Sequence, residues 1–194
     1  TTTPISTRSA TLERLMPLAD NPAIDAILVA EPSCLSAIKD DWLDLSLRTP
    51  IDARRRLAAK CFLPEEYLAA TPALADRLRS ICRVESVPPV VLHGHCHQKA
   101  LWGVDSSAAV LRMVLGDKLR VLETGCCGMA GSFGFTADRY DLSMKIGELT
   151  LFPALRQNPD ARVCAPGTSC RHQIHDGTRR EASHPIEILA SLLA

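Results

Sequence analysis

The sequence predicts an α/β fold, with a small parallel sheet that carries helices on its faces. Two observations carry this prediction. Short aliphatic runs, each bounded by proline, glycine or charged residues, have the length and composition of buried strands. Segments with helical spacing lie between these runs, and a repeated strand-then-helix order is typical of parallel sheets. The predicted strands are Asp25–Ala30, Pro89–His93, Lys118–Glu123 and Ala161–Ala165.

The predicted helices fill the intervals between the strands and close the chain. The last one begins at a proline, a residue suited to the first turn of a helix, with Ser183 or His184 near its cap. The short basic run from Arg54 to Arg56 is expected to be a solvated helix face. The predicted helices are Leu35–Leu47, Ile51–Ala59, Pro64–Ala70, Ala73–Cys82, Ser106–Leu115, Asp138–Phe152 and Pro185–Leu193.

Composition narrows the class of protein. The 194 residues are 46% apolar and 23% charged, with a formal net charge of zero, which argues against a large nucleic-acid footprint. No apolar run is long enough to span a membrane, and the first residues do not resemble a signal peptide. We therefore expect a cytoplasmic protein, either free or peripheral to the inner membrane face. In a reducing compartment, eight cysteines indicate metal binding or catalysis rather than disulfides.

Cysteines follow each of the predicted strands. Loops at the carboxyl ends of parallel strands gather at one edge of a sheet, so cysteines that are distant in sequence can meet there. Three other cysteines lie within predicted elements and are expected to be small buried apolar residues: Cys61 and Cys82 in helices, and Cys164 in a strand. The cysteines after the strands are Cys34, Cys96, Cys126, Cys127 and Cys170.

Four of these cysteines could hold an iron–sulfur cluster, because a four-iron cluster takes four thiolates. Gly125 and Gly128 flank the adjacent pair, where they would permit tight turns and close backbone approach. Their amides could also donate hydrogen bonds to sulfur and tune the reduction potential. The four predicted metal ligands are Cys96, Cys126, Cys127 and Cys170.

Two other functions fit the same residues. Four Cys and His side chains in a tetrahedral array also suit Zn²⁺, so the loops could form a zinc-binding structural or interaction module. His95 and His97 are candidate ligands there, although roles beside the ligands or in the core are favoured for them and for His93. A thiol redox enzyme is the third interpretation, in which Cys126 and Cys127 form a disulfide or Cys96 is an activated thiolate.

A short internal echo suggests a duplicated module. Ser33-Cys34 and Ser169-Cys170 are each followed by isoleucine and aspartate at the same spacing, and each follows a strand and a proline. The second copy has all four cysteines, whereas the first shows only its end. The prediction is a truncated first module at 1–50, a helical connector at 51–87 and a complete second module at 88–194.

The cysteine pattern resembles a known family. The strings His95-Cys96-His97, Gly125-Cys126-Cys127-Gly128 and Ser169-Cys170 are similar to the cysteine-rich CCG domain. That domain occurs in heterodisulfide reductase, in the iron–sulfur subunits of several dehydrogenases, and in fused FAD-linked oxidases. The surroundings resemble the C-terminal region of the fused enzymes most closely: Leu92–Trp102, Glu123–Phe135, Tyr140–Glu148 and Gly167–Ile174.

The resemblance implies an electron relay in an FAD-linked dehydrogenase for D-2-hydroxyacids such as lactate, glycolate or 2-hydroxyglutarate. Electrons would pass from flavin through a 4Fe-4S cluster on the four cysteines to a quinone or another carrier, and Cys34 would be the last ligand of the truncated module. The FAD and the ferredoxin-type domains would lie outside this chain, which on its own is expected to be inactive. The full family motif ends in Cys-x-x-Cys, but its earlier position here is Gly167, which puts a five-cysteine non-cubane cluster in doubt.

Overall fold

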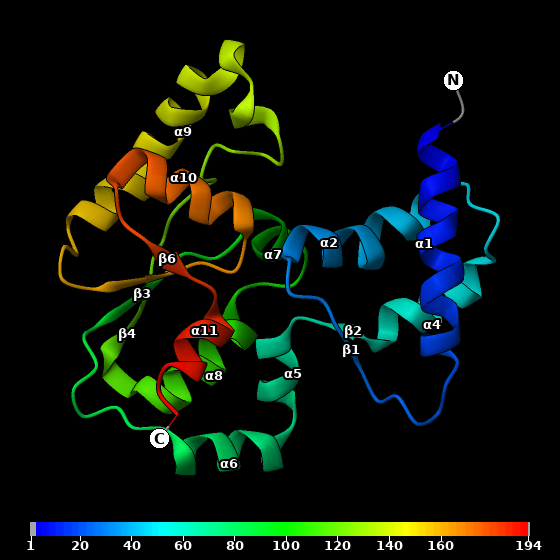
Figure 1. Ribbon diagram of the computed structural model, residues 1–194, viewed down its shortest axis with the longest axis horizontal. Coiled ribbons are helices and arrows are strands. Elements are labelled where there is room, and N and C mark those ends of the chain that lie inside the picture. The colour runs from blue at the N-terminus through cyan, green and yellow to red at the C-terminus, as the bar shows by residue number, and fades with distance from the viewer. Residues whose placement is uncertain (1–2, 194) are drawn as a thin grey trace.

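The computed structural model describes residues 3–193 and contains a four-stranded parallel sheet flanked by helices (Figure 1). The strand order is β4-β3-β5-β6, so the chain runs from β3 outward to β4 and then returns to the other side of β3. In register, Val91 of β3 lies between Arg120 of β4 and Val163 of β5. The strands are β3 (Val90–Leu92), β4 (Leu119–Val121), β5 (Arg162–Cys164) and β6 (Ala182–Ser183).

Helices cover both faces of this sheet, because side chains alternate between the faces along each strand. Val90, Leu92 and Cys164 point to one side and pack with α8 (Asp105–Leu115) and α11 (Pro185–Ala190). Val91 and Val163 point to the other side. There they pack with side chains of the two longer helices of this region, α9 (Ala137–Arg156) and α10 (Thr168–Thr178).

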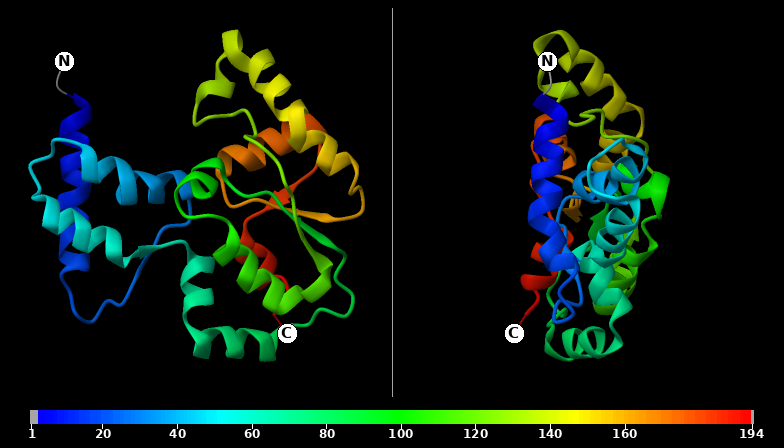
Figure 2. Two further views of the ribbon diagram at one scale, coloured as in Figure 1. Left: turned by 180° about the vertical axis from the view of Figure 1, so that it is seen from behind. Right: turned by 90° about the vertical axis from the view of Figure 1, so that its right-hand side faces the viewer.

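The first sixty residues build a separate apolar cluster beside the sheet. Figure 2 shows α1 and α4 at one end of the molecule and the four-stranded sheet at the other. Leu12, Leu35 and Leu57 are fully buried in this cluster and come from three different helices. A two-stranded parallel sheet pairs Ile27 with Cys61. The elements are α1 (Thr3–Ala19), β1 (Ile27–Leu28), α2 (Pro32–Ser36), the π-helix η1 (Ala37–Asp41), α3 (Trp42–Asp44), α4 (Ile51–Lys60) and β2 (Cys61–Phe62).

Short elements connect the two regions and complete the loops at the sheet. The helix α5 packs against α8, and α7 begins directly after the loop that follows β3. The remaining elements are α5 (Pro64–Ala70), α6 (Pro72–Ile81), α7 (Cys96–Leu101), and the 3-10 turns η2 (Gly116–Lys118) and η3 (Phe133–Phe135). No helix in the described part of the chain is both long and apolar enough to cross a membrane.

The predicted fold class is confirmed, and each of the four predicted strands contains an observed one. The observed strands are shorter, although backbone hydrogen bonds continue the ladders beyond them, as from His93 N to Cys164 O at 2.9 Å. The predicted helix Leu35–Leu47 begins earlier, at Pro32, and is interrupted by the π-helix. Sequence reasoning missed α1, α7, β2 and β6, and its helix ranges did not include α10.

Three expectations are wrong. Cys82 is neither buried nor within a helix: it is half-buried and follows α6, which ends at Ile81. Arg54 is not on a solvated face: it is 8% exposed, and its guanidinium donates hydrogen bonds to Trp42 O and Leu45 O, where α3 ends. Burial is tolerated there because the charged group satisfies helix-end carbonyls that have no partner within the helix. Cys61 is not in a helix. It is buried as expected, but it is the first residue of β2.

Candidate metal centre

The three loops that carry the predicted ligands meet at one edge of the sheet. Cys96 follows β3, the adjacent pair Cys126 and Cys127 follows β4, and Cys170 follows β5. The strands β3 and β5 are neighbours, but the chain leaves β3 towards β4 on one side and leaves β5 towards β6 on the other. The carboxyl ends of β3 and β5 therefore form the topological switch point of the sheet, where α/β folds form their binding crevices. Strand order therefore brings these cysteines together although they are far apart in sequence.

The four thiols contact one another in series. Cys96 hydrogen-bonds with Cys126, Cys126 also with Cys127, and Cys127 with Cys170. Cys127 and Cys170 are buried, whereas Cys96 and Cys126 are half-buried. The structure thus gives the group a deep pair and a pair nearer the surface.

Hydrogen bonding between the thiols separates their acidities. The pKa of Cys126 lies far below its ordinary value, because the Cys127 and Cys96 thiols and the Gly128 amide donate to its sulfur. The pKa of Cys170 is also lowered well below that value, mainly by the hydrogen bond from Cys127. The pKa values of Cys96 and Cys127 are raised, chiefly because each hydrogen-bonds to Cys126. The deprotonated form that metals bind is therefore already favoured at two of the four positions.

The two glycines around the pair have different roles. Gly128 has a φ of +99°, and a Cβ there would lie 2.1 Å from the backbone oxygen of Ser143. Its amide donates to Cys126 Sγ at 3.3 Å, as expected. Gly125 needs no special conformation, because the nearest atom to a Cβ there would be Thr150 Oγ1 at 3.5 Å. The expected close backbone approach is correct for Gly128 alone.

His93 lies behind the thiols and is fully buried. Its Nδ1 is 2.6 Å from Thr124 Oγ1, and its ring interacts with the sulfur of Cys170. Nε2 of this ring has no oxygen or nitrogen partner among the described residues. A buried ring nitrogen next to thiols can hydrogen-bond to a sulfur-rich group, so this position suits such a group.

Several polar side chains that sequence reasoning missed hold the loop after β4 in place. Lys99 of α7 donates hydrogen bonds to Thr124 O and Gly125 O. Ser143 of α9 donates to Gly128 O at 2.9 Å, and Gln173 of α10 donates to Ser143 Oγ at 2.9 Å. The helical positions of these residues gave no signal, because the partners of Lys99 and Ser143 are backbone atoms of the loop and the partner of Gln173 is Ser143, all distant in sequence.

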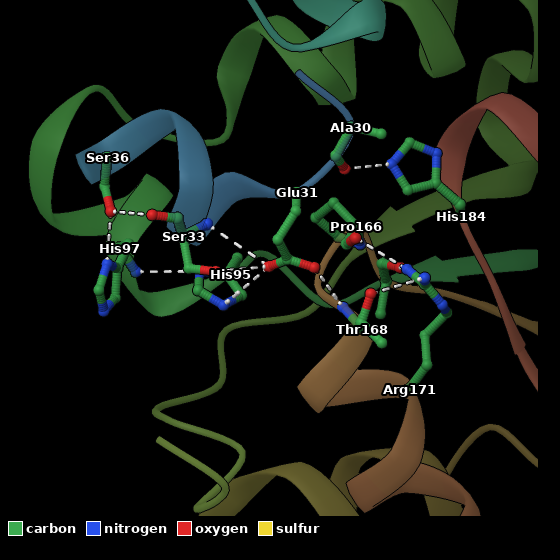
Figure 3. Close-up of polar contacts among 11 residues, drawn as sticks. Ala30, Glu31, Ser33, Ser36, His95, His97, Pro166, Thr168, Arg171 and His184 are labelled. Carbon is green, nitrogen blue, oxygen red and sulfur yellow. Dashed lines mark hydrogen bonds and ion pairs between the residues drawn. The ribbon is translucent and has the colours of Figure 1, made fainter. Parts of the chain in front are cut away.

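The other two histidines connect the centre to the first part of the chain (Figure 3). His95 is 4% exposed, and its Nδ1 accepts the His97 amide at 3.2 Å, which caps α7. The Nδ1 of His97 is 2.7 Å from Ser36 Oγ of α2. His95 Nε2 lies 3.8 Å from a carboxylate oxygen of Glu31, a residue that sequence reasoning did not select. The position of Glu31 directly before Pro32-Ser33 could have identified it as the cap of a helix.

The remaining cysteines lie outside this group. Cys34 is exposed on α2, where it occupies the third helical position, as Cys170 does on α10. Cys164 is fully buried within β5, as expected. Cys82 is half-buried just after α6 and forms an isolated bridge with Leu193.

The donor set can be set against the requirements of metal groups. Thiolates in this number suit an iron–sulfur cluster or a zinc ion, and the buried His93 ring beside Cys170 and the Gly128 amide are further groups that can hydrogen-bond to sulfur. Within residues 3–193, no three or more His, Cys, Asp or Glu side chains are arranged to hold a single metal ion.

Comparison with known proteins relates part of this chain to two kinds of dehydrogenase. Over 105 residues it is 34% identical to a subunit of the anaerobic glycerol-3-phosphate dehydrogenase of Escherichia coli, a match that covers 54% of this chain and 26% of that protein. Over 101 residues it is 35% identical to D-2-hydroxyglutarate dehydrogenase of the same species, covering 52% of this chain and 10% of that enzyme. The enzyme of that name from Pseudomonas putida is 36% identical over 134 residues, covering 67% of this chain and 12% of that enzyme.

This chain therefore spans only about a quarter or a tenth of the length of these relatives. No family model matches it, and no solved structure matches it. This chain is therefore homologous to one portion of each of these dehydrogenase proteins, which are much longer than it is.

Proposed function

We propose that this chain is the iron–sulfur electron-transfer portion of a larger FAD-linked dehydrogenase for D-2-hydroxyacids of the lactate, glycolate or 2-hydroxyglutarate type. The observation that carries the proposal is the meeting of four thiols from three loops at the switch point of the sheet. Similarity to D-2-hydroxyglutarate dehydrogenase supports the substrate class, and the CCG-type cysteine pattern supports the kind of cofactor.

In this proposal Cys96, Cys126, Cys127 and Cys170 hold a 4Fe-4S cluster, which supplies a one-electron carrier when bound. The thiolates of Cys126 and Cys170 are favoured before metal arrives, as their lowered pKa values indicate. The Gly128 amide donates to the sulfur of Cys126, and hydrogen bonds of this kind tune the potential of iron–sulfur centres. Flavin, the hydroxyacid pocket and the electron acceptor belong to other domains or partner chains.

We also propose that the chain contains two related cysteine-bearing regions, at 1–50 and 88–194, joined by a helical connector at 51–87. Support comes from the matching surroundings of two cysteines. Cys34 and Cys170 are third residues of helices that follow β1 and β5, and each of these strands pairs in parallel with the next strand in the chain. Each of those next strands leads within two residues into a helix that begins with proline, at Pro64 and Pro185.

Two cysteine variants test the ligand assignment under anaerobic conditions. After reconstitution with iron and sulfide, Cys127→Ser is expected to lose most of its bound iron and its absorbance near 400 nm, because one of four thiolates is missing. Cys82→Ser is the matched control, since its thiol lies on a different part of the fold, beside Leu193. Iron, acid-labile sulfide and zinc are measured in the wild type and both variants.

The outcomes separate the candidate functions. Equal iron content in the two variants would contradict the ligand assignment. Colourless wild-type protein with stoichiometric zinc after anaerobic preparation would support a zinc-binding structural module instead. Metal-free protein with stable turnover of thiol substrates would support a thiol redox enzyme.

A further inference from the structure

Glu31 joins two parts of the chain that are far apart in sequence. Its side chain comes from the turn that begins α2, and its Oε2 accepts the backbone amide of Thr168 at 2.8 Å. Thr168 is the first residue of α10, the helix that carries Cys170. The second carboxylate oxygen, Oε1, accepts the hydroxyl of Ser33 at 3.0 Å and lies 3.8 Å from His95 Nε2 (Figure 3).

We propose that the Glu31 carboxylate is a positioning residue of the thiolate centre: it fixes His95 against the Cys170 loop, and its negative charge lowers the reduction potential of the bound cluster. This inference rests on the proposed function and adds a residue that sets the reduction potential of the same centre. It assigns the role to a residue from the first part of the chain, outside all of the cysteine-bearing loops after β3, β4 and β5.

The surroundings of Glu31 favour its charged form. Burial raises the pKa of this carboxyl, but hydrogen bonds from Thr168 and Ser33 and the nearby His95 outweigh burial, so that the pKa lies below its ordinary value. The side chain is 24% exposed. The carboxylate is therefore ionised at neutral pH and partly shielded from solvent, where its field is screened less than that of a surface charge.

The hydrogen bond at Nδ1 fixes the orientation of the His95 ring. Because its Nδ1 accepts the His97 amide, the ring proton of the neutral form is on Nε2, which faces Glu31. This orientation is the one in which the ring presents a donor to the carboxylate. Glu31 therefore lies where its charge favours the ring rotation and the tautomer that the His97 amide requires.

The His95 ring also packs against the loop that leads to Cys170. A Cβ at Gly167 would lie 2.3 Å from Cδ2 of His95 and 3.2 Å from the sulfur of Cys170. The ring, the backbone of residue 167 and the thiol are therefore tightly packed. A movement of His95 is therefore expected to be transmitted to the Cys170 loop, because the ring contacts both the Glu31 carboxylate and that loop.

A purely structural role for Glu31 would consist only of linking α2 to α10. That role would affect folding and cluster content, but it requires no charge, because a glutamine oxygen can accept the same backbone amide. The reduction potential of the loaded centre separates the two roles, since it responds to the charge even when the hydrogen bonds persist.

The experiment compares Glu31→Gln with wild type after anaerobic reconstitution of the whole chain. Iron and sulfide per chain are expected to match wild type, and the equilibrium constant for one-electron reduction is expected to rise about tenfold, which is about 59 mV for a one-electron couple. Glu31→Asp, which keeps the charge, is expected to restore a potential closer to that of wild type. Glu85→Gln is the matched control: Glu85 is an exposed carboxylate just before β3, at the opposite end of the strands.

A second variant decides the matter if Glu31→Gln does not load. Ser33→Lys would add a cation beside the carboxylate while leaving the bond to Thr168 intact, and it is expected to raise the potential in the same direction. Loaded Glu31→Gln with a wild-type potential would overturn the inference. An unloaded Glu31→Gln together with a loaded Ser33→Lys of unchanged potential would also overturn it. Wild-type protein that binds no cluster at all would instead refute the proposed function.

Discussion

At the scale of single residues, the His95 ring fills the space that a side chain at position 167 would need. The CCG-type motif that this sequence resembles has a cysteine where this chain has Gly167. Any side chain there would collide with His95 Cδ2, since a Cβ would lie only 2.3 Å away. We expect Gly167→Ala to destabilise the metal-free protein by about 1–3 kcal/mol, the usual effect of overpacking, or several degrees in Tm. Thermal unfolding of the metal-free protein measures the change.

Gly125→Ala is the matched control, because it adds the same methyl group to another loop of the centre. A Cβ there meets only Thr150 Oγ1 at 3.5 Å, which is ordinary contact. Its Tm is expected to equal or slightly exceed that of wild type, since alanine restricts the unfolded chain more than glycine does. Equal unfolding temperatures for the two variants would show that His95 moves aside freely.

The sequence predicts that the cysteines after the strands converge, but it identifies few of the residues around them. Cysteines placed after strands have a topological reason to converge, and Cys96, Cys126, Cys127 and Cys170 do so. Glu31 and Lys99 are ordinary surface residue types whose partners are backbone atoms more than twenty residues away. No local pattern encodes such a contact, so only the folded chain identifies these residues.

At the scale of elements, a buried carboxyl links α5 to α8 and α7. Glu65 is fully buried, its Oε1 accepts the Ser107 hydroxyl at 3.0 Å, and Gln98 donates to the same hydroxyl at 2.7 Å. Glu65 Oε2 has no partner among the described residues. Burial raises the pKa of Glu65 above its ordinary value, against the opposing effect of its hydrogen bonds and of His184.

This raised pKa predicts a pH-dependent stability. Between the pKa of the unfolded chain, about 4.5, and the higher pKa of the folded chain, the folded state holds more protons, so the free energy of unfolding falls as pH rises. Each unit of difference corresponds to about 1.4 kcal/mol. We expect Glu65→Gln to remove this part of the fall, so that its stability relative to wild type improves from pH 5 to pH 8.

Urea unfolding at the two pH values measures the effect, and the difference between them cancels any constant effect of the amide. Glu85→Gln removes an exposed carboxylate instead and is expected to follow the wild-type profile. An identical pH profile for Glu65→Gln and wild type would mean that Glu65 titrates like an exposed carboxyl.

Elements with strong local signals were predicted from the sequence, and the others were not. The strands β1, β3, β4 and β5 follow from their aliphatic runs, whereas β2 and β6 have two residues each and no periodicity to detect. The helix α1 was missed although Leu12, Leu15, Met16 and Ala19 have helical spacing, and these side chains pack in the cluster of the first region. The π-helix within 32–44 depends on packing and has no sequence signature here.

At the scale of the whole molecule, three hydrogen bonds between described residues join the first region to the region of the sheet, beside the contact of Glu31 with His95. His184 Nε2 lies 3.0 Å from Ala30 O, Glu31 accepts the Thr168 amide, and Ser36 Oγ lies 2.7 Å from His97 Nδ1. All of the partners on the sheet side lie in loops, or at helix starts, that follow β3, β5 or β6. The sequence predicts two cysteine-bearing regions but not their junction, which depends on single polar pairs.

The same arrangement predicts how the metal affects the stability of the whole chain. A cluster bound by Cys96, Cys126, Cys127 and Cys170 would connect the loops after three neighbouring strands, and a group that binds only the folded state stabilises it. We expect anaerobically reconstituted protein to unfold several degrees above the metal-free protein, since each kcal/mol raises Tm by about 2–4 °C for a chain of this size. Calorimetry under anaerobic conditions measures both forms, and loss of the cluster in air should return the higher Tm to the lower one. Cys127→Ser should gain little from reconstitution, whereas Cys82→Ser should gain as much as wild type. A reconstituted wild type that holds iron and sulfide but melts with the metal-free protein would mean that the cluster is not held across these loops.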